Sequence, residues 1–183
     1  RHGIVLAKSQ EAKVLGVKTG ETIWQAQLKC PNLLIVPPNY DQYLKHSRWA
    51  RDIYYDYTNQ VEPYGIDECW LDVSGSTHLF GKGKDIAEEI RRRIKKELGI
   101  TVSIGVSFNK IFAKLGSDMK KPDAVTEIPK EDFRDKVWSL PVEELLGVGR
   151  ASKEKLNRLM VFTIGDLAKA DPDLLKSKLG ING

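Results

Sequence analysis

The sequence predicts an α+β fold in which a sheet carries helices on one face, between a small α/β segment and an all-helical segment. Three observations lead to this prediction. Helical and strand-like patterns alternate along residues 40–127, Pro37 and Pro38 break the chain just before them, and residues 128–183 carry helical patterns only. We therefore expect three parts, residues 1–39, 40–127 and 128–183.

The first part is expected to mix short helices with short strands. Helical patterns cover residues 11–15, which end at Gly16, and residues 22–29. Strand-like apolar patterns cover residues 3–7 and 33–36, and the second of these is predicted to be buried.

The middle part supplies the predicted sheet. Helical patterns cover residues 41–58, 85–98 and 109–119, and strand-like patterns cover residues 61–66, 69–73 and 101–106. In the helix over residues 85–98, Ile or Leu recurs at every fourth position, and Lys and Arg fill the other face. This order of elements is typical of a sheet with helices on one face.

The last part is expected to be helical throughout. Short helical patterns cover residues 133–138, 141–145, 152–160, 163–169 and 171–179. Pro141 suits a first helical turn, and Asp171 before Pro172 suits a capping residue followed by proline.

Composition limits the class of protein. The 183 residues are 41% hydrophobic, as in ordinary globular proteins, and the longest apolar stretches are too short to span a membrane. The chain begins with Arg1 and a strand-like pattern, not with Met or a secretory leader, so we expect a piece of a longer protein. Cys30 and Cys69 have no Cys or His at metal-ligand spacing, which indicates reduced, structural cysteines of an intracellular protein.

Positive charge is concentrated in one stretch of the chain. The formal net charge is only +4, but residues 84–121 contain ten Lys or Arg against five Asp or Glu. Such a field attracts nucleic acid. A solvated helix face explains the same charges equally well.

Asp67 and Glu68 stand side by side between two apolar strands. In a regular strand they would point to opposite faces, whereas at a turn both can reach one space. Two like charges there need a positive partner, and Mg²⁺ suits carboxylate oxygens and substrate phosphates. A solvated acidic hairpin turn is the alternative. Asp72, a third acid, is interpreted as structural, either facing solvent or starting a turn toward Gly75.

Basic residues flank the helix over residues 109–119. Lys110 and Lys114 are four positions apart and share one face, and Lys121 lies in the exit turn before Pro122. Next to a carboxylate turn, such a cluster can hold both a metal ion and a polyphosphate. An ordinary basic surface is the alternative.

A glycine-rich connection precedes the helix over residues 152–160. Gly147 and Gly149 are expected to let the backbone pack tightly and to expose N–H groups that bind one phosphate. Arg150 and Lys153 can add positive charge. The pattern reads as a helix-hairpin-helix, and a simple helical turn is the alternative.

The stretch YGIDECWLDV at residues 64–73 resembles the palm motif of Y-family lesion-bypass DNA polymerases, the DinB- and UmuC-like group that is also called ImpB/MucB/SamB. There the stretch usually reads Tyr-Ser-Ile-Asp-Glu-Ala, an aromatic residue, Leu and Asp, so Gly65, Cys69 and Trp70 are mild departures. Residues 105–122 resemble a second family pattern that ends in Lys-Pro. The resemblance covers nearly the whole chain, in the order fingers, palm and thumb.

The resemblance implies roles for individual residues. The second and third catalytic carboxylates fall on Asp67 and Glu68, which would bind metal, and the lysine that contacts the nucleotide triphosphate falls on Lys121. In the fingers motif, Gln10 and Lys13 stand where many members have the Tyr and Arg that hold the triphosphate. Lys13 keeps the charge but loses the bidentate fork.

The resemblance also implies the domains and the activity. Residues 1–39 would be part of the fingers, residues 40–127 a palm-type domain, and residues 128–183 a thumb with a helix-hairpin-helix. The DNA contacts fall on Lys110, Lys114, Gly147, Gly149, Arg150 and Lys153. The implied reaction is attack of a primer 3′-hydroxyl on a deoxynucleoside triphosphate opposite damaged template, with two Mg²⁺ ions, during DNA repair and the SOS response.

Some parts of the family pattern are expected outside the chain. The first palm strand, with the first catalytic Asp and an aromatic gate against ribonucleotides, is expected before Arg1. A little-finger domain and any tail that binds a sliding clamp are expected after Gly183. We therefore predict that the fragment alone is inactive or nearly so. Its parent is expected to be a bacterial cytoplasmic protein that joins the nucleoid when acting, with primer–template DNA as partner and no membrane.

Two other functions compete with this interpretation. A non-catalytic DNA-binding module could be built on the helix-hairpin-helix alone, and it would not need the acids. A nucleotidyl cyclase shares a palm-like acid pair, but it does not explain the helical segment after residue 128.

Overall fold

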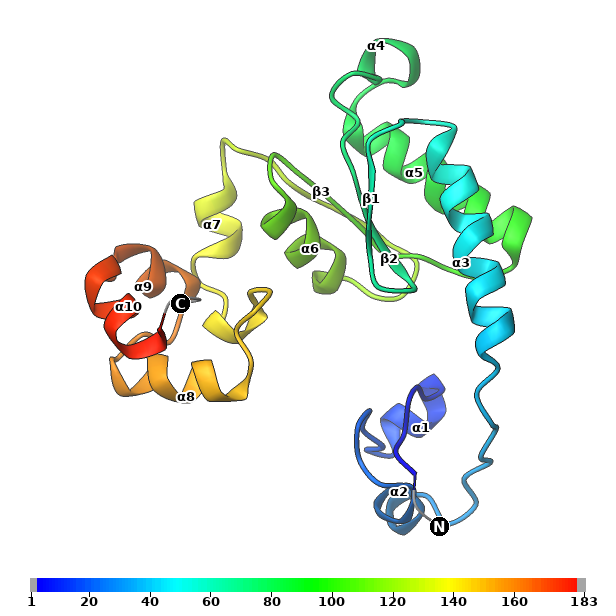
Figure 1. The fold of residues 1–183 in the computed structure, drawn as a ribbon, viewed down its shortest axis with the longest axis horizontal. Coiled ribbons are helices and arrows are strands. Elements are labelled where there is room, and N and C mark those ends of the chain that lie inside the picture. The colour runs from blue at the N-terminus through cyan, green and yellow to red at the C-terminus, as the bar shows by residue number, and fades with distance from the viewer. Residues whose placement is uncertain (1–2, 181–183) are drawn as a thin grey trace. The chain divides into compact units, whose positions relative to one another are not determined.

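The computed structural model describes residues 3–180 and mixes helices with short strands (Figure 1). This mixture confirms the α+β class. The chain divides into two compact units, an N-terminal unit, Arg1–Leu44, and a C-terminal unit, Lys45–Gly183. The boundary falls inside helix α3, Tyr40–Tyr55. The division into three functional parts stays a prediction.

Two short helices, α1 (Gln10–Val14) and α2 (Ile23–Lys29), build the N-terminal unit. The sequence starts α2 with a capping box, in which Thr22 and Gln25 each accept a hydrogen bond from the other's backbone N–H. The small core between the two helices consists of Val5, Ala12, Val17 and Ala26.

The two strands predicted in this unit are wrong. Residues 3–7 contribute only one isolated bridge, at Ile4, and residues 33–36 form no strand. Leu34 and Val36, which were expected to be buried, have 84% and 73% of their surface exposed. A short apolar run becomes a strand only when neighbouring backbone pairs with it along its length. Residues 3–5 pair with residues 20–23 over too short a stretch, and residues 33–36 pair with no strand of the described residues.

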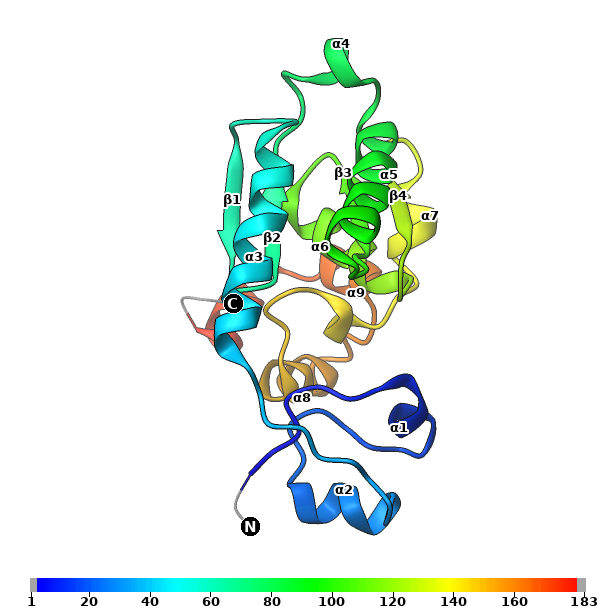
Figure 2. The same cartoon turned by 90° about the vertical axis from the view of Figure 1, so that its right-hand side faces the viewer.

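The C-terminal unit starts with the rest of α3 and a β-hairpin that lies beside it in both views (Figures 1 and 2). The elements in order are β1 (Val61–Tyr64), β2 (Glu68–Leu71), α4 (Thr77–Phe80), α5 (Gly83–Arg93) and the π-helical segment η1 (Ile94–Leu98). β1 and β2 are antiparallel, with Pro63 opposite Cys69. η1 continues α5 directly, so the two form one helix with a change of winding at Ile94.

A second sheet is formed by β3 (Ile104–Ser107) and β4 (Val125–Ile128), which run parallel and are connected by helix α6 (Lys110–Met119). The sequence pattern does not predict β4, because Thr126 and Glu127 interrupt its short apolar run. Within the described residues, the four strands form two separate two-stranded sheets.

Helices cover both faces of β3, which corrects the prediction of helices on one face. Ile104 packs against a core between α3 and α5 that consists of Ile53, Tyr57, Ile86, Ile90 and Ile94. Successive residues of a strand face opposite sides of the sheet, so the next residue, Gly105, faces the other side. There its backbone lies directly against α6. Figure 1 shows α5 and α6 on opposite sides of β3. The order of elements along the chain does not determine which face a helix covers.

As far as residue 180, the last part is helical, as predicted, in five short pieces. These are α7 (Phe133–Val137), the 3₁₀ turn η2 (Val142–Glu144), α8 (Arg150–Arg158), α9 (Ile164–Lys169) and α10 (Pro172–Leu179). Asp171 caps α10 and Pro172 is its first residue, which confirms that prediction. Among residues 3–180, every helix is too short or too polar to cross a lipid bilayer.

Gly105→Ala is expected to destabilise the protein by about 3 kcal/mol or more. A Cβ atom at this position would lie 1.8 Å from the carbonyl oxygen of Ala113, so β3 or α6 must move. Urea unfolding followed by circular dichroism measures the change. Gly75→Ala is the matched control, because a Cβ atom there meets no heavy atom within 4 Å. An equal loss of stability in both variants would contradict the close approach of α6 to β3.

Candidate active site

The predicted acid pair lies at the end of the β1–β2 hairpin. Tyr64 and Glu68 form the last strand pair, so Gly65, Ile66 and Asp67 make the connecting turn. Gly65 has a φ of +80°, a left-handed conformation that a side chain disfavours. Asp67 is therefore exposed on the turn, whereas Glu68 is the first residue of β2. The prediction that both acids belong to the turn holds for Asp67 only.

Glu68 is held by a lysine of α6, and this contact begins a series of alternating charges. The Lys114 ammonium lies 2.8 Å from Glu68 Oε1 and 2.9 Å from Asp118 Oδ2. The other oxygen of Asp118 lies 2.7 Å from Lys121 Nζ. Glu68, Lys114, Asp118 and Lys121 thus form a continuous series from the hairpin to the exit of α6, which we call the polar chain.

The charges of the polar chain stabilise one another. Burial of the Lys114 ammonium acts to lower its pKa, but the hydrogen bonds to Asp118 and Glu68 outweigh burial and leave the pKa raised. Burial likewise acts to raise the pKa of Asp118, and the bonds from Lys114 and Lys121 outweigh it and leave that pKa lowered. Both groups therefore carry charge at neutral pH. The Lys114 side chain is only 17% exposed.

Trp70 fixes the start of α6 against the hairpin. Its indole N–H donates to the carbonyl oxygen of Lys110 at 3.1 Å, and the Lys110 ammonium lies 5.3 Å from the centroid of its ring. Lys110 also forms an ion pair with Glu62 of β1. Because Lys114 lies one helical turn after Lys110, these contacts bring it to Glu68.

Arg51 of α3 supports the turn that carries Asp67. Its NH2 group donates a hydrogen bond to the carbonyl oxygen of Gly65 at 3.2 Å. Burial raises the pKa of the neighbouring Cys69 thiol, which stays neutral at pH 7. Cys30 and Cys69 are both free thiols, as predicted.

Asp72 starts the turn that leaves β2. Its Oδ1 atom accepts a hydrogen bond from the N–H of Ser74 at 2.9 Å, and hydrogen bonding to Ser74 lowers its pKa. The interpretation that Asp72 starts this turn is thus confirmed.

The connection before α8 does not pack as predicted. Gly147 has a φ of +92° and Gly149 precedes the first residue of α8, but a Cβ atom at either glycine would meet no heavy atom within 4 Å. The prediction that these two glycines allow tight packing is therefore wrong. Only the left-handed φ of Gly147 favours glycine at that position. Arg150 is 93% exposed, and Lys153 forms an ion pair with Glu143. The open space leaves room for a ligand at the start of α8.

Gln10 and Lys13 lie in the N-terminal unit, on α1. Both are exposed, and because they are three positions apart they share one face of the helix. Their role in nucleotide binding stays a prediction.

Much of the positive charge in residues 84–121 is neutralised by ion pairs with carboxylates. Six of the ten cations there contact carboxylates: Arg91, Arg93, Lys95, Lys110, Lys114 and Lys121. The positive field over this stretch is therefore weaker than composition alone indicates.

Sequence reasoning missed three residues that organise this site. Asp118 lies four positions after Lys114 and three before Lys121, and this helical spacing could have identified it. Glu62 and Arg51 reach the site only through tertiary contacts, for which the sequence gives no local signal.

The donors available to a metal ion are the two neighbouring acids. Residues 3–180 contain no group of three or more His, Cys, Asp or Glu side chains placed to hold one. Asp67 and Glu68 offer carboxylate oxygens, and Mg²⁺ is commonly held by one or two carboxylates together with substrate phosphates. The donor chemistry therefore fits Mg²⁺.

Comparison with known proteins identifies the family. The sequence profile of the impB/mucB/samB family matches residues 1–118, and the chain belongs to this family, as predicted. A DNA polymerase IV of Acetivibrio thermocellus is 62% identical, over 98% of this chain and 45% of its own length. DNA polymerase IV 1 of Bacillus subtilis is 46% identical, over 100% of this chain and 44% of its own length.

A solved structure shows the same fold. The crystal structure of DinB from Sulfolobus solfataricus matches with a TM-score of 0.88 at 29% identity, over 98% of this chain and 53% of that one. The chain thus spans about half the length of the relatives that it matches.

Lys114→Met is expected to lower the free energy of unfolding at pH 7 by about 1–3 kcal/mol, because Glu68 and Asp118 lose the cation between them. The loss should shrink in acid. The pKa of Asp118 in the folded protein lies below its ordinary 3.8, so its contribution to stability is present above pH 3.8 and is lost as pH falls through the lowered value.

Urea unfolding at pH 7 and in steps to about pH 2 measures this effect. Lys120→Met, at an exposed lysine after the last turn of α6, is the control. If Lys114→Met cost the same free energy at every pH, the coupling to Asp118 would be absent.

Proposed function

We propose that this chain is the catalytic part of a template-directed DNA polymerase of the translesion type, which adds deoxynucleotides to a primer 3′ end opposite damaged template. The observation that carries the proposal is the acid pair, Asp67 and Glu68, beside a polar chain that leads to Lys121. The names of the two bacterial relatives support it, since both are DNA polymerases IV. Because the chain spans less than half of their length, the activity is proposed for the full-length protein.

Asp67 and Glu68 would hold Mg²⁺ near the primer end, and two ions are expected. Bound there, Mg²⁺ would lower the pKa of the primer 3′-hydroxyl and stabilise the pyrophosphate that leaves. The protein's own contribution is placement. The strand pair fixes the backbone of Glu68, and the turn leaves Asp67 exposed, so both carboxylates would be available to hold the ions.

Lys121 would contact the triphosphate of the incoming nucleotide. Its side chain is 55% exposed at the exit of α6, and Asp118 holds its ammonium from the helix side. Gln10 and Lys13 are proposed as further nucleotide contacts from α1, because Lys13 supplies a positive charge and Gln10 an amide donor.

DNA would be held by backbone contacts without sequence readout. At the start of α8, open space around Gly147 and Gly149 lets a phosphate approach the N–H groups, and Arg150 and Lys153 add charge. Lys110 is proposed as a contact from α6, where its side chain is 55% exposed.

Lys114 is the weakest of the proposed DNA contacts. Its ammonium is already paired with Glu68 and Asp118, so a phosphate must compete with two carboxylates. The proposed partners are primer–template DNA and deoxynucleoside triphosphates, with a sliding clamp as a further candidate. The proposed setting is the bacterial cytoplasm, at the nucleoid.

Asp67→Asn in the full-length protein is expected to reduce primer extension by at least about 1000-fold, because a neutral amide cannot replace a metal-binding carboxylate. Extension of a labelled primer on an undamaged and a damaged template measures the rate. Asp72→Asn is the matched control, since Asn can also accept the turn bond from Ser74.

The result separates the proposal from its rivals. A non-catalytic DNA-binding module predicts that Asp67→Asn changes no activity at all. A nucleotidyl cyclase predicts a cyclic nucleotide product that forms without template, so product analysis with and without DNA distinguishes it from a polymerase.

Arg150→Ala is expected to weaken DNA binding uniformly across sequences and to reduce the slope of log K against log salt by about 0.9, as the loss of one phosphate contact requires. Fluorescence anisotropy with labelled duplexes at several salt concentrations measures both quantities. Arg158→Ala, at the last residue of the same helix, is the control. Equal effects of the two variants would place the phosphate contact elsewhere than the start of α8.

A further inference from the structure

Asp123 lies two residues after Lys121, in the connection between α6 and β4. Its φ of +55° is left-handed, a conformation that Asp and Asn tolerate better than most residues. Its side chain is only 18% exposed. An acid in this position is turned away from solvent, and its partners explain why.

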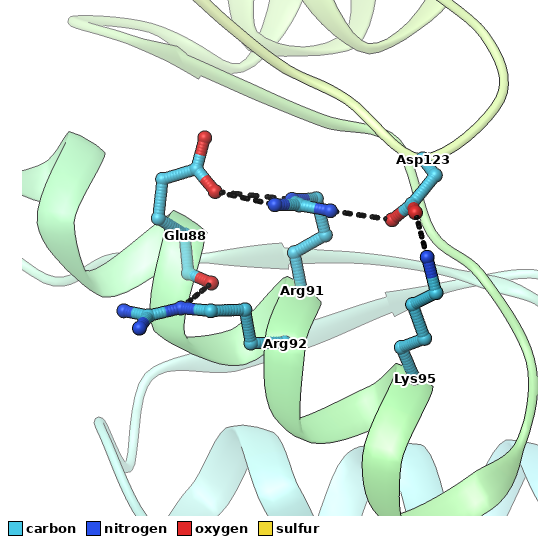
Figure 3. A network of polar contacts seen from close by, with 5 residues as sticks. All are labelled: Glu88, Arg91, Arg92, Lys95 and Asp123. Atoms are coloured by element: carbon cyan, nitrogen blue, oxygen red, sulfur yellow. Dashed lines mark hydrogen bonds and ion pairs between the residues drawn. The ribbon is translucent and has the colours of Figure 1, made fainter.

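Both carboxylate oxygens of Asp123 are held by cations of the helix formed by α5 and η1 (Figure 3). Arg91 NH1 lies 2.7 Å from Oδ1, and Lys95 Nζ lies 2.7 Å from Oδ2. Arg91 and Lys95 are four positions apart, so they rise from one face of this helix on successive turns. We call these three residues the Asp123 anchor.

Glu88 orients the arginine of the anchor. Arg91 donates from Nε and NH2 to Glu88 Oε2, at 3.0 Å and 2.9 Å, and so presents NH1 to Asp123 (Figure 3). Arg92 donates to the backbone oxygen of Glu88 at 3.2 Å. Glu88 therefore fixes one edge of the guanidinium, and Asp123 binds the NH1 group on the other. A lysine could not make the contacts to Glu88 and to Asp123 in this way.

Contacts lie on both sides of Lys121 in this connection. Before it, Asp118 of α6 binds the Lys121 ammonium. After it, the Asp123 anchor holds the backbone to α5 and η1, and the N–H of Ile104 donates to the carbonyl oxygen of Ala124 at 2.9 Å. Asp118 holds only the tip of a flexible side chain, whereas the anchor and the hydrogen bond at Ala124 hold the chain two and three residues after Lys121.

We propose that Arg91, Lys95 and Asp123 are positioning residues for nucleotide binding, which hold the α6–β4 connection so that Lys121 meets the triphosphate. The inference rests on the proposed function and deepens it. The three residues do not touch the nucleotide; they act through Lys121. The hydrogen bonds from Lys95 and Arg91 also lower the pKa of Asp123, so the anchor is fully charged at neutral pH.

The first test is Asp123→Asn in the full-length protein. Asn keeps the size and the tolerance of a left-handed φ, so the variant removes only the charge. The expected result is a KM for the nucleotide that rises about 3- to 10-fold with little change in kcat, as expected for the loss of partly exposed charge-assisted hydrogen bonds. Lys96→Met, at an exposed lysine next to the anchor, is the control and should leave KM unchanged.

The second test compares variants at the two cations. Lys95→Arg keeps the charge and should behave as the wild type, whereas Lys95→Met should raise KM. Arg91→Lys should raise KM by less than the loss of the positive charge would. Its ammonium keeps the charge but cannot bind Glu88 and Asp123 as the guanidinium does. Each effect should be non-additive with Asp123→Asn, since all three residues belong to one network.

Hydrogen exchange gives a readout that does not depend on activity. In Asp123→Asn, the amide protons at positions 120, 121, 123 and 124 should exchange faster while those of α5 stay protected. If the wild type extends primers and Asp123→Asn leaves both KM and exchange unchanged, the inference is overturned. A loss of kcat together with faster exchange throughout α5 would also overturn it, because it would show a general loss of stability.

The outcome for the proposed function is separate. If the wild-type full-length protein extends no primer, the polymerase proposal fails and the positioning role for nucleotide fails with it. If the wild type is active, the KM values and the exchange data decide the positioning role alone.

Discussion

The Lys114 ammonium, placed between Glu68 and Asp118, is the interaction on which the site in the C-terminal unit depends. It joins Glu68 of the hairpin to a helical residue 46 positions further along the chain, and the hairpin and this helix share no backbone pairing. Two carboxylates this close would repel each other without a cation between them. The same contact turns Glu68 toward α6 and sets Asp118 to meet Lys121.

Helix α6 can carry these contacts because it is fixed at its start, along its length and beyond its end. Asn109 caps its first turn, and Trp70 binds the backbone of Lys110. Along its length, Gly105 lets it lie directly on β3. Beyond its end, Asp123 ties the following connection to α5 and η1. The residues with proposed chemical roles thus sit on a support whose parts come from distant positions in the sequence.

Local signals predicted the elements that depend on local chemistry. The capping residue Asp171 and the Ile repeat of α5 identified their helices within a few residues. The acid pair was found from its motif. Tertiary pairing decided the rest: β4 forms because it meets β3, residues 33–36 form no strand because they meet no partner, and helices cover both faces of β3. Asp118 could have been found from helical spacing, whereas Arg51 could not.

The proline of β1 has a consequence for how the hairpin behaves toward other molecules. The N–H of Asp72 donates to Gln60, and hydrogen-bonded pairs alternate along an antiparallel ladder, so the nitrogen of Pro63 faces away from β2. The outer border of β1 therefore lacks a donor at its centre. A foreign extended segment that approached there would find an incomplete row of partners, which protects this border against intermolecular sheet growth and aggregation.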